Sequence, residues 1–476
     1  MILSDFFDYL KVNPKYAILL ILIVVLSVYQ QYVNEALKNP QKKEKPLRPK
    51  LPIKPQKKAT GIIFGRIGRK VMYSPIEDEG HVICIAGSGG GKTSGVCIPS
   101  IRSACQDPKK CTCFCIDISG DISSNCTVPN KLLFNIEDEH TIPYNIFAEI
   151  DNEPNVEIRN ELLDTLSFLI MPDKPGAEDA AAYFLSNGRD MLIGSLIAFY
   201  HQGLDFVPIC KKILSMDYVS LLNAIVDTKN NAAIDRIASF SGCNEKNTSE
   251  SKKCLDQYIK LYATNFRMAN AVRRPKENEL CITPQALKDH NVFLQIPDEK
   301  TDIYGPLLGI CSAQAFHYCA ARKNGENPTI LFVLDEFASL RIDAGTILAA
   351  IRKYRKKRVR VMLLTQSVTD LDYMYGSGHA GSDVRKIILA NIKYSLVLGS
   401  TDPNTQCYFS DLCGKQEIRT KSTNFSTNSS SISYGAKESY RVPPEAFGQL
   451  NGQLYLICSD GRYQKLKTNY YFKYDK

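Results

Sequence analysis

Hydrophobic and polar positions recur with different periods along this 476-residue chain, and the changes of period divide it into segments. Short apolar runs broken by glycine turns predict strands over residues 60–152. Apolar residues then recur at three- and four-residue spacing over 153–275, which is typical of packed helices. Over 276–476, apolar strands alternate with helical stretches. The pattern predicts an α/β fold with a mainly parallel sheet, built from 60–152 and 276–476, and an all-α domain inserted between them.

Residues 1–37 contain the strongest apolar run of the chain, YAILLILIVVLSVYQQYV over 16–33. Eighteen helical residues reach about 27 Å, so the run predicts a transmembrane helix. A signal peptide is the first alternative, but positive charge follows the run and no small-residue cleavage site does. A buried core helix is the second alternative, and the polar, proline-broken flank disfavours it. We therefore expect a membrane anchor.

Most of the formal charge of +9 lies in one segment, the predicted tether over 38–59. From Lys38 to Lys58 there are nine Lys or Arg and one Glu, a local net charge of +8. Positive charge beside a membrane span stays on the cytoplasmic side. The expected location is therefore the bacterial inner (plasma) membrane, single-pass, with the bulk of the chain cytoplasmic and the tether along the membrane surface.

The sixteen cysteines are scattered, which indicates reduced thiols rather than a disulfide framework. Cys111, Cys113 and Cys115 alternate along a predicted strand, close after Cys105. Alternating residues share one face of a strand, so we expect these thiols to pack in the core. A zinc site is the alternative, but it favours pairs of the C-x2-C type, and these cysteines are spaced C-x-C.

The stretch CIAGSGGGKTSG, residues 84–95, follows a buried strand and precedes a helix. Glycines let backbone N–H groups point at phosphate oxygens, a lysine reaches the β- and γ-phosphates, and the next hydroxyl coordinates Mg²⁺. Ala86 stands where the general pattern has its first glycine. We predict a site for ATP and Mg²⁺ in which Lys92 acts on the phosphates and Thr93 on the metal. The expected nucleotide-binding residues are Gly87, Ser88, Gly89, Gly90, Gly91, Lys92, Thr93 and Ser94.

A second buried strand, ILFVLDEF, ends in two carboxylates. In this kind of site an acidic residue at a strand end holds Mg²⁺, and a neighbouring one polarises the attacking water. We assign the first role to Asp335 and the second to Glu336. Surface charges at a strand end are the alternative.

Two further residues are catalytic candidates. Gln366 lies at the tip of the next strand, where a γ-phosphate sensor is expected, although a solvated glutamine gives the same pattern. Seven of the nine residues in RKYRKKRVR, 352–360, are basic. A solvated helix end or a contact with nucleic acid would explain the run, but in ring-shaped motors an arginine here reaches the neighbouring nucleotide. We choose Arg355, with Arg352 and Arg358 as competitors.

With these pieces in order, the chain resembles the type IV secretion coupling proteins, the pumps of bacterial conjugation. The likeness covers nearly everything after residue 60. It is carried by the glycine loop with alanine in first place and by GVCIPS, CIDISGD, NGRDMLIGSLIAFY, LDEFASL, LTQS, LANIKYSLVLGSTDPNT and RVPPEAF. Asp117 and Gly120 match a family strand, whereas Ser119 and Asp121 replace its lysine and glutamate. Many relatives have two transmembrane helices, and here one is expected.

The resemblance implies a membrane-anchored ATPase with a RecA-like motor domain and an all-α domain that meets the substrate. It implies a homo-oligomer, a hexameric ring with nucleotide between subunits. The implied partners are single-stranded DNA with bound relaxase, the secretion channel and the membrane. The Ser-, Thr- and Asn-rich stretch 415–440 is expected to be a long flexible loop.

Two alternative functions stay open. A partition-type translocase of duplex DNA uses the same fold but usually carries a C-terminal DNA-reading domain, and here KLKTNYYFKYDK directly follows a strand. A non-hydrolysing membrane scaffold that recruits DNA complexes would not need Lys92, Thr93, Asp335 and Glu336. We therefore expect ATP-driven transfer of DNA or nucleoprotein in conjugation or mobilisation.

Overall fold

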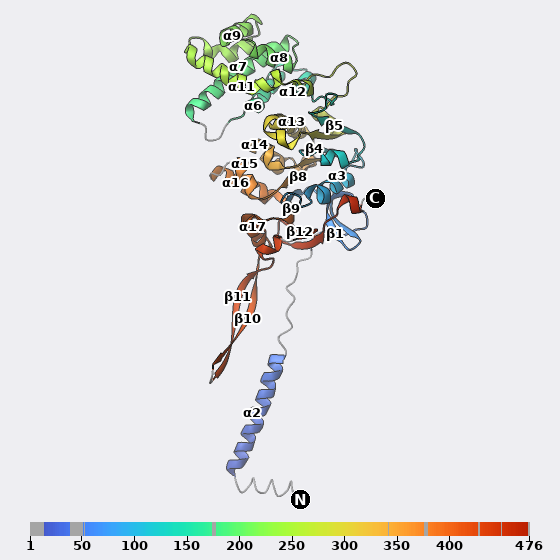
Figure 1. Ribbon diagram of the computed structural model, residues 1–476, viewed down its shortest axis with the longest axis vertical. Coiled ribbons are helices and arrows are strands. Elements are labelled where there is room, and N and C mark those ends of the chain that lie inside the picture. Colours follow the sequence, from blue (N-terminus) through green and yellow to red (C-terminus); the bar gives the residue numbers. More distant parts are fainter. Residues whose placement is uncertain are drawn as a thin grey trace. The chain divides into compact units, whose positions relative to one another are not determined.

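The computed structural model describes residues 14–38, 51, 53–173, 178–340, 342–375, 379–426, 429–448 and 450–474 (Figure 1). The chain divides into two compact units, residues 1–50 and residues 51–476. In the first unit the described part is a single helix, α2 (Pro14–Lys38). The second unit contains every other described element.

Helix α2 corrects the prediction of a membrane anchor. Among the described residues, none of the helices combines the length and the apolar character that crossing a bilayer requires. The predicted span over 16–33 and the single-pass location in the bacterial inner membrane with a cytoplasmic body are therefore wrong. Most of the predicted tether, 39–50, lies outside the described residues.

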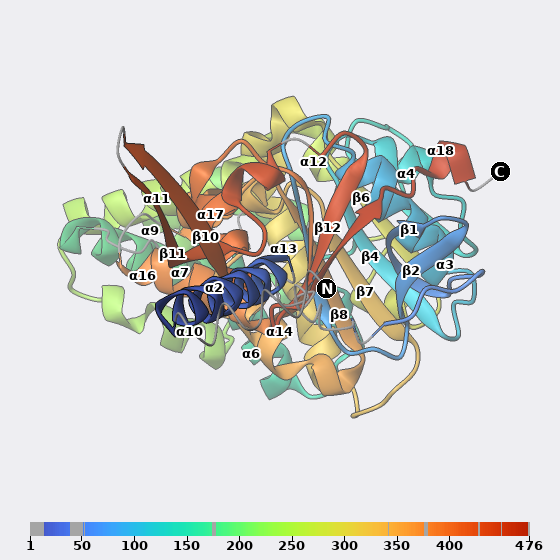
Figure 2. The ribbon, with the colours of Figure 1, turned by 90° about the horizontal axis from the view of Figure 1, so that it is seen from below.

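An eleven-stranded sheet organises the second unit, in the order β2-β1-β13-β12-β9-β3-β8-β7-β4-β6-β5. Figure 1 shows β5, β4, β8, β9 and β12 one below another in agreement with this order, and Figure 2 shows the same sheet from below. The strands are β1 (Gly61–Ile67), β2 (Lys70–Pro75), β3 (His81–Ala86), β4 (Cys111–Asp117), β5 (Lys131–Asn135), β6 (Asn291–Gln295), β7 (Thr329–Leu334), β8 (Val359–Thr365), β9 (Ile392–Gly399), β12 (Gln453–Cys458) and β13 (Tyr463–Lys467).

The seven strands from β9 to β5 in this order run parallel, and antiparallel pairs join β9, β12, β13, β1 and β2. The prediction of a mainly parallel sheet is confirmed. Every residue of β3, β4, β7 and β8 is buried, which explains why these strands appear as continuous apolar runs in the sequence. Because the strands are parallel, their carboxyl ends meet at one edge of the sheet, where ligands bind in such folds.

Helices cover both faces of the sheet, and the core has a cluster on each face. The cluster with Val82 and Cys84 also contains Cys111, Cys113 and Cys115, so the prediction that these thiols share one face is confirmed. The sheet-side helical elements are η1 (Thr93–Cys97), α3 (Ile98–Ala104), α4 (Asp121–Asn125), α5 (Ala148–Asn152), η3 (Pro284–Lys288), η4 (Asp298–Lys300), α13 (Thr301–Ala321), η5 (Phe337–Ser339), α14 (Ala344–Lys353), η6 (Arg355–Lys357), α15 (Thr369–Tyr375), α16 (His379–Asn391), α17 (Pro403–Cys413), η7 (Pro444–Phe447) and α18 (Tyr471–Tyr474).

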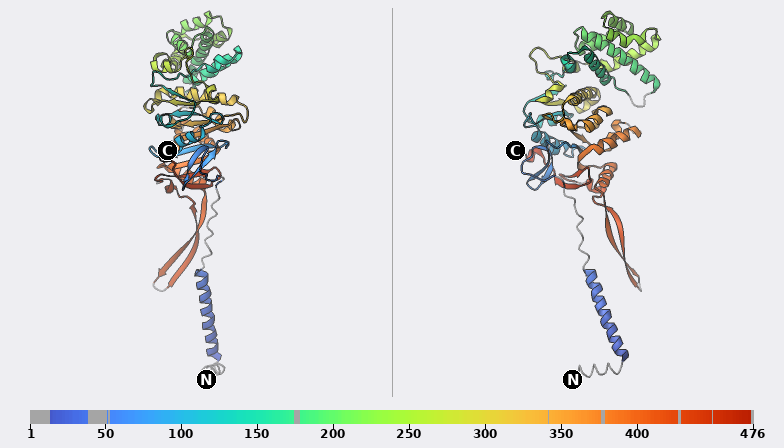
Figure 3. Two further views of the ribbon diagram at one scale, coloured as in Figure 1. Left: turned by 90° about the vertical axis from the view of Figure 1, so that its right-hand side faces the viewer. Right: turned by 180° about the vertical axis from the view of Figure 1, so that it is seen from behind.

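Between β5 and β6 the chain forms a group of helices, which Figures 1 and 3 show gathered together. Helix α7 is central, because α6, α8, α9, α10 and α11 all pack on it. Asn155, Asp205, Asp217, Asn230 and Asn244 start helices here by accepting hydrogen bonds from the first free backbone N–H groups. The helices are α6 (Val156–Ile170), α7 (Asp179–His201), α8 (Phe206–Leu214), α9 (Tyr218–Asp227), α10 (Asn231–Ile237), η2 (Ala238–Phe240), α11 (Glu245–Thr264) and α12 (Phe266–Ala271).

The expectation of a flexible loop over 415–440 is wrong. This stretch forms β10 (Lys415–Ser426) and β11 (Ser429–Tyr440), an antiparallel pair that makes a sheet of its own. Composition misled the prediction, since serine and asparagine are common in loops. The threonines, isoleucines and aromatic residues spaced between them favour strands.

Candidate nucleotide-binding site

The glycine loop follows β3 and turns back through two residues with positive φ. Gly89 has φ +70° and Gly91 has φ +86°, a backbone region that side chains strongly disfavour. Lys92 then starts the helical segment, and the Gly95 N–H donates to the Gly91 carbonyl over 2.8 Å. Buried strand, glycine turn and helix thus succeed one another as a phosphate-binding loop requires.

Ala86 fits this loop because of the residue opposite to it. A side-chain Cβ on Gly90 would lie 2.7 Å from the Ala86 Cβ and 2.9 Å from the Gly87 carbonyl oxygen. The methyl group of Ala86 therefore occupies room that the bare backbone of Gly90 leaves. An alanine in place of the first glycine is compatible with the loop as long as residue 90 is glycine.

Lys92 points back toward the end of β3 and toward the neighbouring acidic strand. Its side chain is 6% exposed, and its Nζ donates to the Ala86 carbonyl over 2.8 Å. The same Nζ lies 3.3 Å from a carboxylate oxygen of Glu336. The lysine predicted to bind phosphate is thus paired with the carboxylate predicted to act on water.

Asp335 follows directly after β7 and is 4% exposed. Burial, and then the charges of Glu336 and Asp117, raise the pKa of Asp335 to about 7, although Lys92 opposes this. A nearby cation stabilises the ionised form of a carboxylate in this environment. Asp335 lies beside the loop that carries Thr93. The Asp335 carboxylate and the Thr93 hydroxyl are the kinds of protein oxygen that bind Mg²⁺ together with phosphate oxygens and water.

The residues of the site thus fit a Mg²⁺ ion held mainly by substrate. No group of three or more His, Cys, Asp or Glu side chains suited to holding a metal by themselves occurs in the part of the chain that the structure describes. Thr93 and Asp335 would contribute one oxygen each. This agrees with the way Mg²⁺ is bound at phosphate sites, by one or two protein oxygens.

Glu336 has φ +43°, which is unusual for a residue with a side chain and costs of order 1–3 kcal/mol. Besides Lys92, its carboxylate contacts Gln366, whose Nε2 donates to the second Glu336 oxygen over 3.3 Å. The structure therefore brings Lys92, Glu336 and Gln366 together from β3, β7 and β8. Their catalytic roles stay predictions.

A residue that the sequence analysis missed holds Gln366 in place. The Asp370 carboxylate accepts the backbone N–H groups of Gln366 and Ser367 over 3.0 and 2.9 Å and the Thr365 hydroxyl over 3.0 Å. The Ser367 hydroxyl and Asp370 also exchange hydrogen bonds, as in a helix capping box. The spacing Ser-x-x-Asp in SVTD was the available signal.

Asp117 ends β4, the strand beside β7, and its side chain is fully buried. It accepts the N–H groups of Gly120 and Ser123 over 2.9 and 2.6 Å, which fixes the turn after β4. Its charge reaches Asp335 and adds to the raised pKa there. Asp117 thus supports the site, and Ser119 and Asp121 lie in the turn that it fixes.

The basic run 352–360 lies at the other end of β8. Arg360 is buried and donates to the carbonyls of Gly80 and Pro75, and Arg358 donates to the Asn327 side chain over 2.6 Å. Arg352 and Arg355 are exposed. The seven residues of β8 separate Arg355 from Gln366 by about 20 Å. The structure therefore does not bring Arg355 to Lys92 of its own chain.

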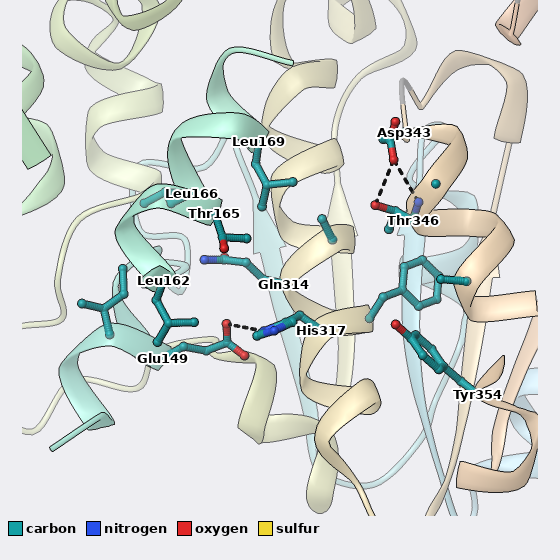
Figure 4. A pocket seen from close by; sticks show the side chains of 15 residues that line it. Glu149, Leu162, Thr165, Leu166, Leu169, Gln314, His317, Asp343, Thr346 and Tyr354 are labelled. Atoms are coloured by element: carbon teal, nitrogen blue, oxygen red, sulfur yellow. Dashed lines mark hydrogen bonds and ion pairs between the residues drawn. The ribbon is translucent and has the colours of Figure 1, made fainter. Parts of the chain in front are cut away.

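A separate cavity of about 350 Å³ lies between α6, α13 and α14 (Figure 4). Leu162, Leu166 and Tyr354 form part of its wall, and His317 Nδ1 lies 3.4 Å from the Glu149 carboxylate at one side. This hydrogen bond raises the pKa of His317. The cavity joins a helix of the predicted all-α domain to the helices of the sheet, away from the glycine loop.

Comparisons with known proteins agree with the fold. The family model described as "Type IV secretory system Conjugative DNA transfer" matches residues 41–474. The bacterial conjugative coupling protein TrwBdeltaN70, in its unbound monoclinic form, is similar with a TM-score of 0.65 and 17% identity over 87% of this chain and 89% of that chain.

Two nucleotide complexes of plasmid coupling protein TrwB are similar too. The complex with ADP and Mg²⁺ has a TM-score of 0.65 and 16% identity, and the complex with a non-hydrolysable ATP analogue has 0.64 and 17%; each covers 87% of this chain and 90% of that chain. No curated protein sequence matches. At this identity the likeness shows that the chain shares the fold of these nucleotide-binding proteins.

Proposed function

Because the chain belongs to the type IV secretory system conjugative DNA transfer family, we propose that it is an ATPase that drives relaxase-bound single-stranded DNA toward a type IV secretion channel. The observation that supports this most is the meeting of Lys92, Glu336 and Gln366 beside the glycine loop. A scaffold that does not hydrolyse nucleotide has no use for a lysine, a carboxylate and an amide in this arrangement.

In the proposed reaction each of these residues has a distinct task. Backbone N–H groups of residues 87–94 hold the phosphates, and Lys92 exchanges its contacts with Ala86 and Glu336 for the β- and γ-phosphates. Thr93 and Asp335 would hold the Mg²⁺ ion, which would neutralise charge on the phosphates. Glu336 orients the attacking water and accepts its proton, and Gln366 contacts the γ-phosphate.

The ring and the partners belong to the same proposal. We propose a hexameric homo-oligomer with nucleotide between subunits, in which Arg355 of one subunit stabilises charge at the γ-phosphate of the next. The exposed position of Arg355, far along β8 from its own Gln366, supports action on a neighbour. The helices α6–α12 would meet the cargo.

The experiment that tests the proposal is ATP turnover by the full chain with and without single-stranded and duplex DNA. We expect turnover that rises with single strands and is lost in Glu336→Gln. Stimulation by duplex DNA alone would instead indicate a partition-type translocase. Turnover that stays at the level of Glu336→Gln in an oligomer of confirmed assembly would indicate a scaffold.

A further inference from the structure

The segment after β13, residues 468–474, packs directly against the glycine loop. A Cβ on Gly91 would lie 3.1 Å from Cε1 and 3.3 Å from the hydroxyl of Tyr470. A Cβ on Gly95 would overlap the methyl group of Thr468. Gly95 does not have positive φ, so its lack of a side chain is explained by this packing and not by its backbone conformation.

Hydrogen bonds and a cation–π contact with other parts of the chain hold residues 468–474 in place. The Thr468 N–H donates to the Gly452 carbonyl over 3.0 Å, and Asn469 accepts from Arg66 over 2.8 Å. The Tyr471 hydroxyl donates to the Asn125 side chain over 2.9 Å, and the Arg102 guanidinium lies 4.9 Å from the centre of the Tyr471 ring. Tyr470 is therefore fixed beside Gly91.

A second aromatic ring, that of Phe472, stacks on the ring of Tyr470. The rings of Tyr470 and Phe472 are stacked, with centres 5.3 Å apart and planes at 23°. Phe472 is 51% exposed, and the Lys473 ammonium lies 5.1 Å from the Tyr470 ring centre. An exposed aromatic side chain, stacked on another and close to a cation, forms a wall beside the loop without an evident role in the core.

The ribose and base of a nucleotide bound in the loop would extend toward this aromatic wall. Glu336 and Gln366 mark the γ-phosphate end, because both lie with Lys92 on the side of β7 and β8. The α-phosphate is held by the loop backbone, so ribose and base leave on the remaining side. That side includes the edge from Gly91 to Gly95, where Tyr470 and Thr468 lie.

We propose that Tyr470 and Phe472 bind the nucleoside half of the nucleotide, with Phe472 as the face on which the base stacks. This inference rests on the proposed ATP site. Stacking on an aromatic ring is available to every base. The wall therefore gives affinity for purine nucleotides with little preference between ATP and GTP.

The test compares Phe472→Ala with Tyr474→Ala in the full-length chain. Tyr474 belongs to the same short helix and is 46% exposed, but its ring lies over Arg66, 4.4 Å from the guanidinium carbon, and so it serves as a matched control. The dissociation constants of ATP, GTP and inorganic tripolyphosphate are measured for each protein. Tripolyphosphate occupies the loop but has neither ribose nor base.

We expect Phe472→Ala to raise the dissociation constants of ATP and GTP by a similar factor of about 10, which corresponds to the loss of one base–aromatic contact. The dissociation constant of tripolyphosphate should stay unchanged. Phe472→Tyr should restore both nucleotides, and Tyr474→Ala should change none of the three ligands. Equal weakening of tripolyphosphate, or unchanged ATP binding, would overturn the inference alone. A wild-type chain that binds tripolyphosphate and ATP equally would also overturn it, whereas one that binds neither would overturn the proposed ATP site with it.

Discussion

The ammonium of Lys92 lies 3.3 Å from the carboxylate of Glu336, and this ion pair joins the glycine loop to the acidic strand β7. In the proposed reaction a phosphate group that draws Lys92 away leaves Glu336 without its cation. The carboxylate then becomes available to a water molecule only when a phosphate is present.

Gly90→Ala should weaken ATP binding by about 10-fold or more. The new methyl group would meet the Ala86 Cβ and the Gly87 carbonyl at distances that force the loop to shift. Restoring room with Ala86→Gly in the same chain should recover part of the loss, since the Gly87 contact remains. The measurement is an ATP titration of the two single variants and the double variant. Purely additive losses would show that Ala86 and Gly90 do not share the room between them.

Asp370→Ala should lower ATP turnover at least several-fold, because Gln366 loses the carboxylate that holds its backbone. We also expect a loss of about 1–3 kcal/mol in the free energy of unfolding. Asp343→Ala removes a comparable helix cap, at the Thr346 N–H, away from Gln366. The control should therefore lose stability without a matching loss of turnover. Equal effects of both variants on turnover would mean that Asp370 is only a cap.

Arg355→Ala subunits mixed into wild-type rings should lower ATP turnover by more than the fraction of altered subunits in the mixture. Each altered subunit would inactivate the site of its neighbour while its own loop stays intact. Arg352→Ala, also an exposed arginine of this run, is the matched control and should give at most a proportional decline. Turnover is measured as a function of the mixing ratio. A proportional decline for Arg355→Ala would refute its action on the neighbouring subunit.

Stability should fall between pH 6.5 and pH 4 because of His81. Burial, together with Arg355 and Arg360, lowers the pKa of His81 to about 4, although its hydrogen bond to the Ile351 carbonyl opposes this. The backbone N–H of Val361 donates to Nδ1, so Nε2 carries the proton and donates to Ile351. Its contribution is fully present above pH 6.5, the value in the unfolded chain, and is lost as pH falls, since only the unfolded chain then binds a proton.

The expected loss from His81 is about 3 kcal/mol at pH 4, one pKa unit being 1.36 kcal/mol. His81→Asn keeps an acceptor for the Val361 N–H and has no charge to gain. Unfolding free energies of both proteins at several pH values give the test. The variant should be less stable at pH 7 but should lose less stability on acidification. Parallel pH profiles would show that His81 does not account for the effect.

The sequence allowed the central strands and the main site residues to be predicted for one physical reason. Strands buried on both faces leave long apolar runs, and the residues directly after each run lie at the carboxyl edge of the sheet. Lys92, Asp335, Glu336 and Gln366 all come after such runs. The family resemblance, which depends on the same stretches, is confirmed by the match over 41–474.

Other features depend on contacts that no local pattern encodes. Tyr470 acquires its place only because β13 pairs between β12 and β1 and carries the chain back to the loop. Asp370 is one carboxylate among many until Gln366 is seen to depend on it. The pair β10–β11 was missed because composition was given more weight than the spacing of its threonines and isoleucines.

The attachment of helices α6–α12 has a consequence for how such a protein diversifies. The chain leaves the sheet after β5 and returns into β6, its direct neighbour, and three strands separate β6 from β3. The helical group is thus inserted at one point of the sheet, three strands away from β3, the strand that leads into the glycine loop. If these helices meet the cargo, as proposed, substitutions that suit a new cargo can accumulate there without altering the strands that lead into the phosphate-binding residues.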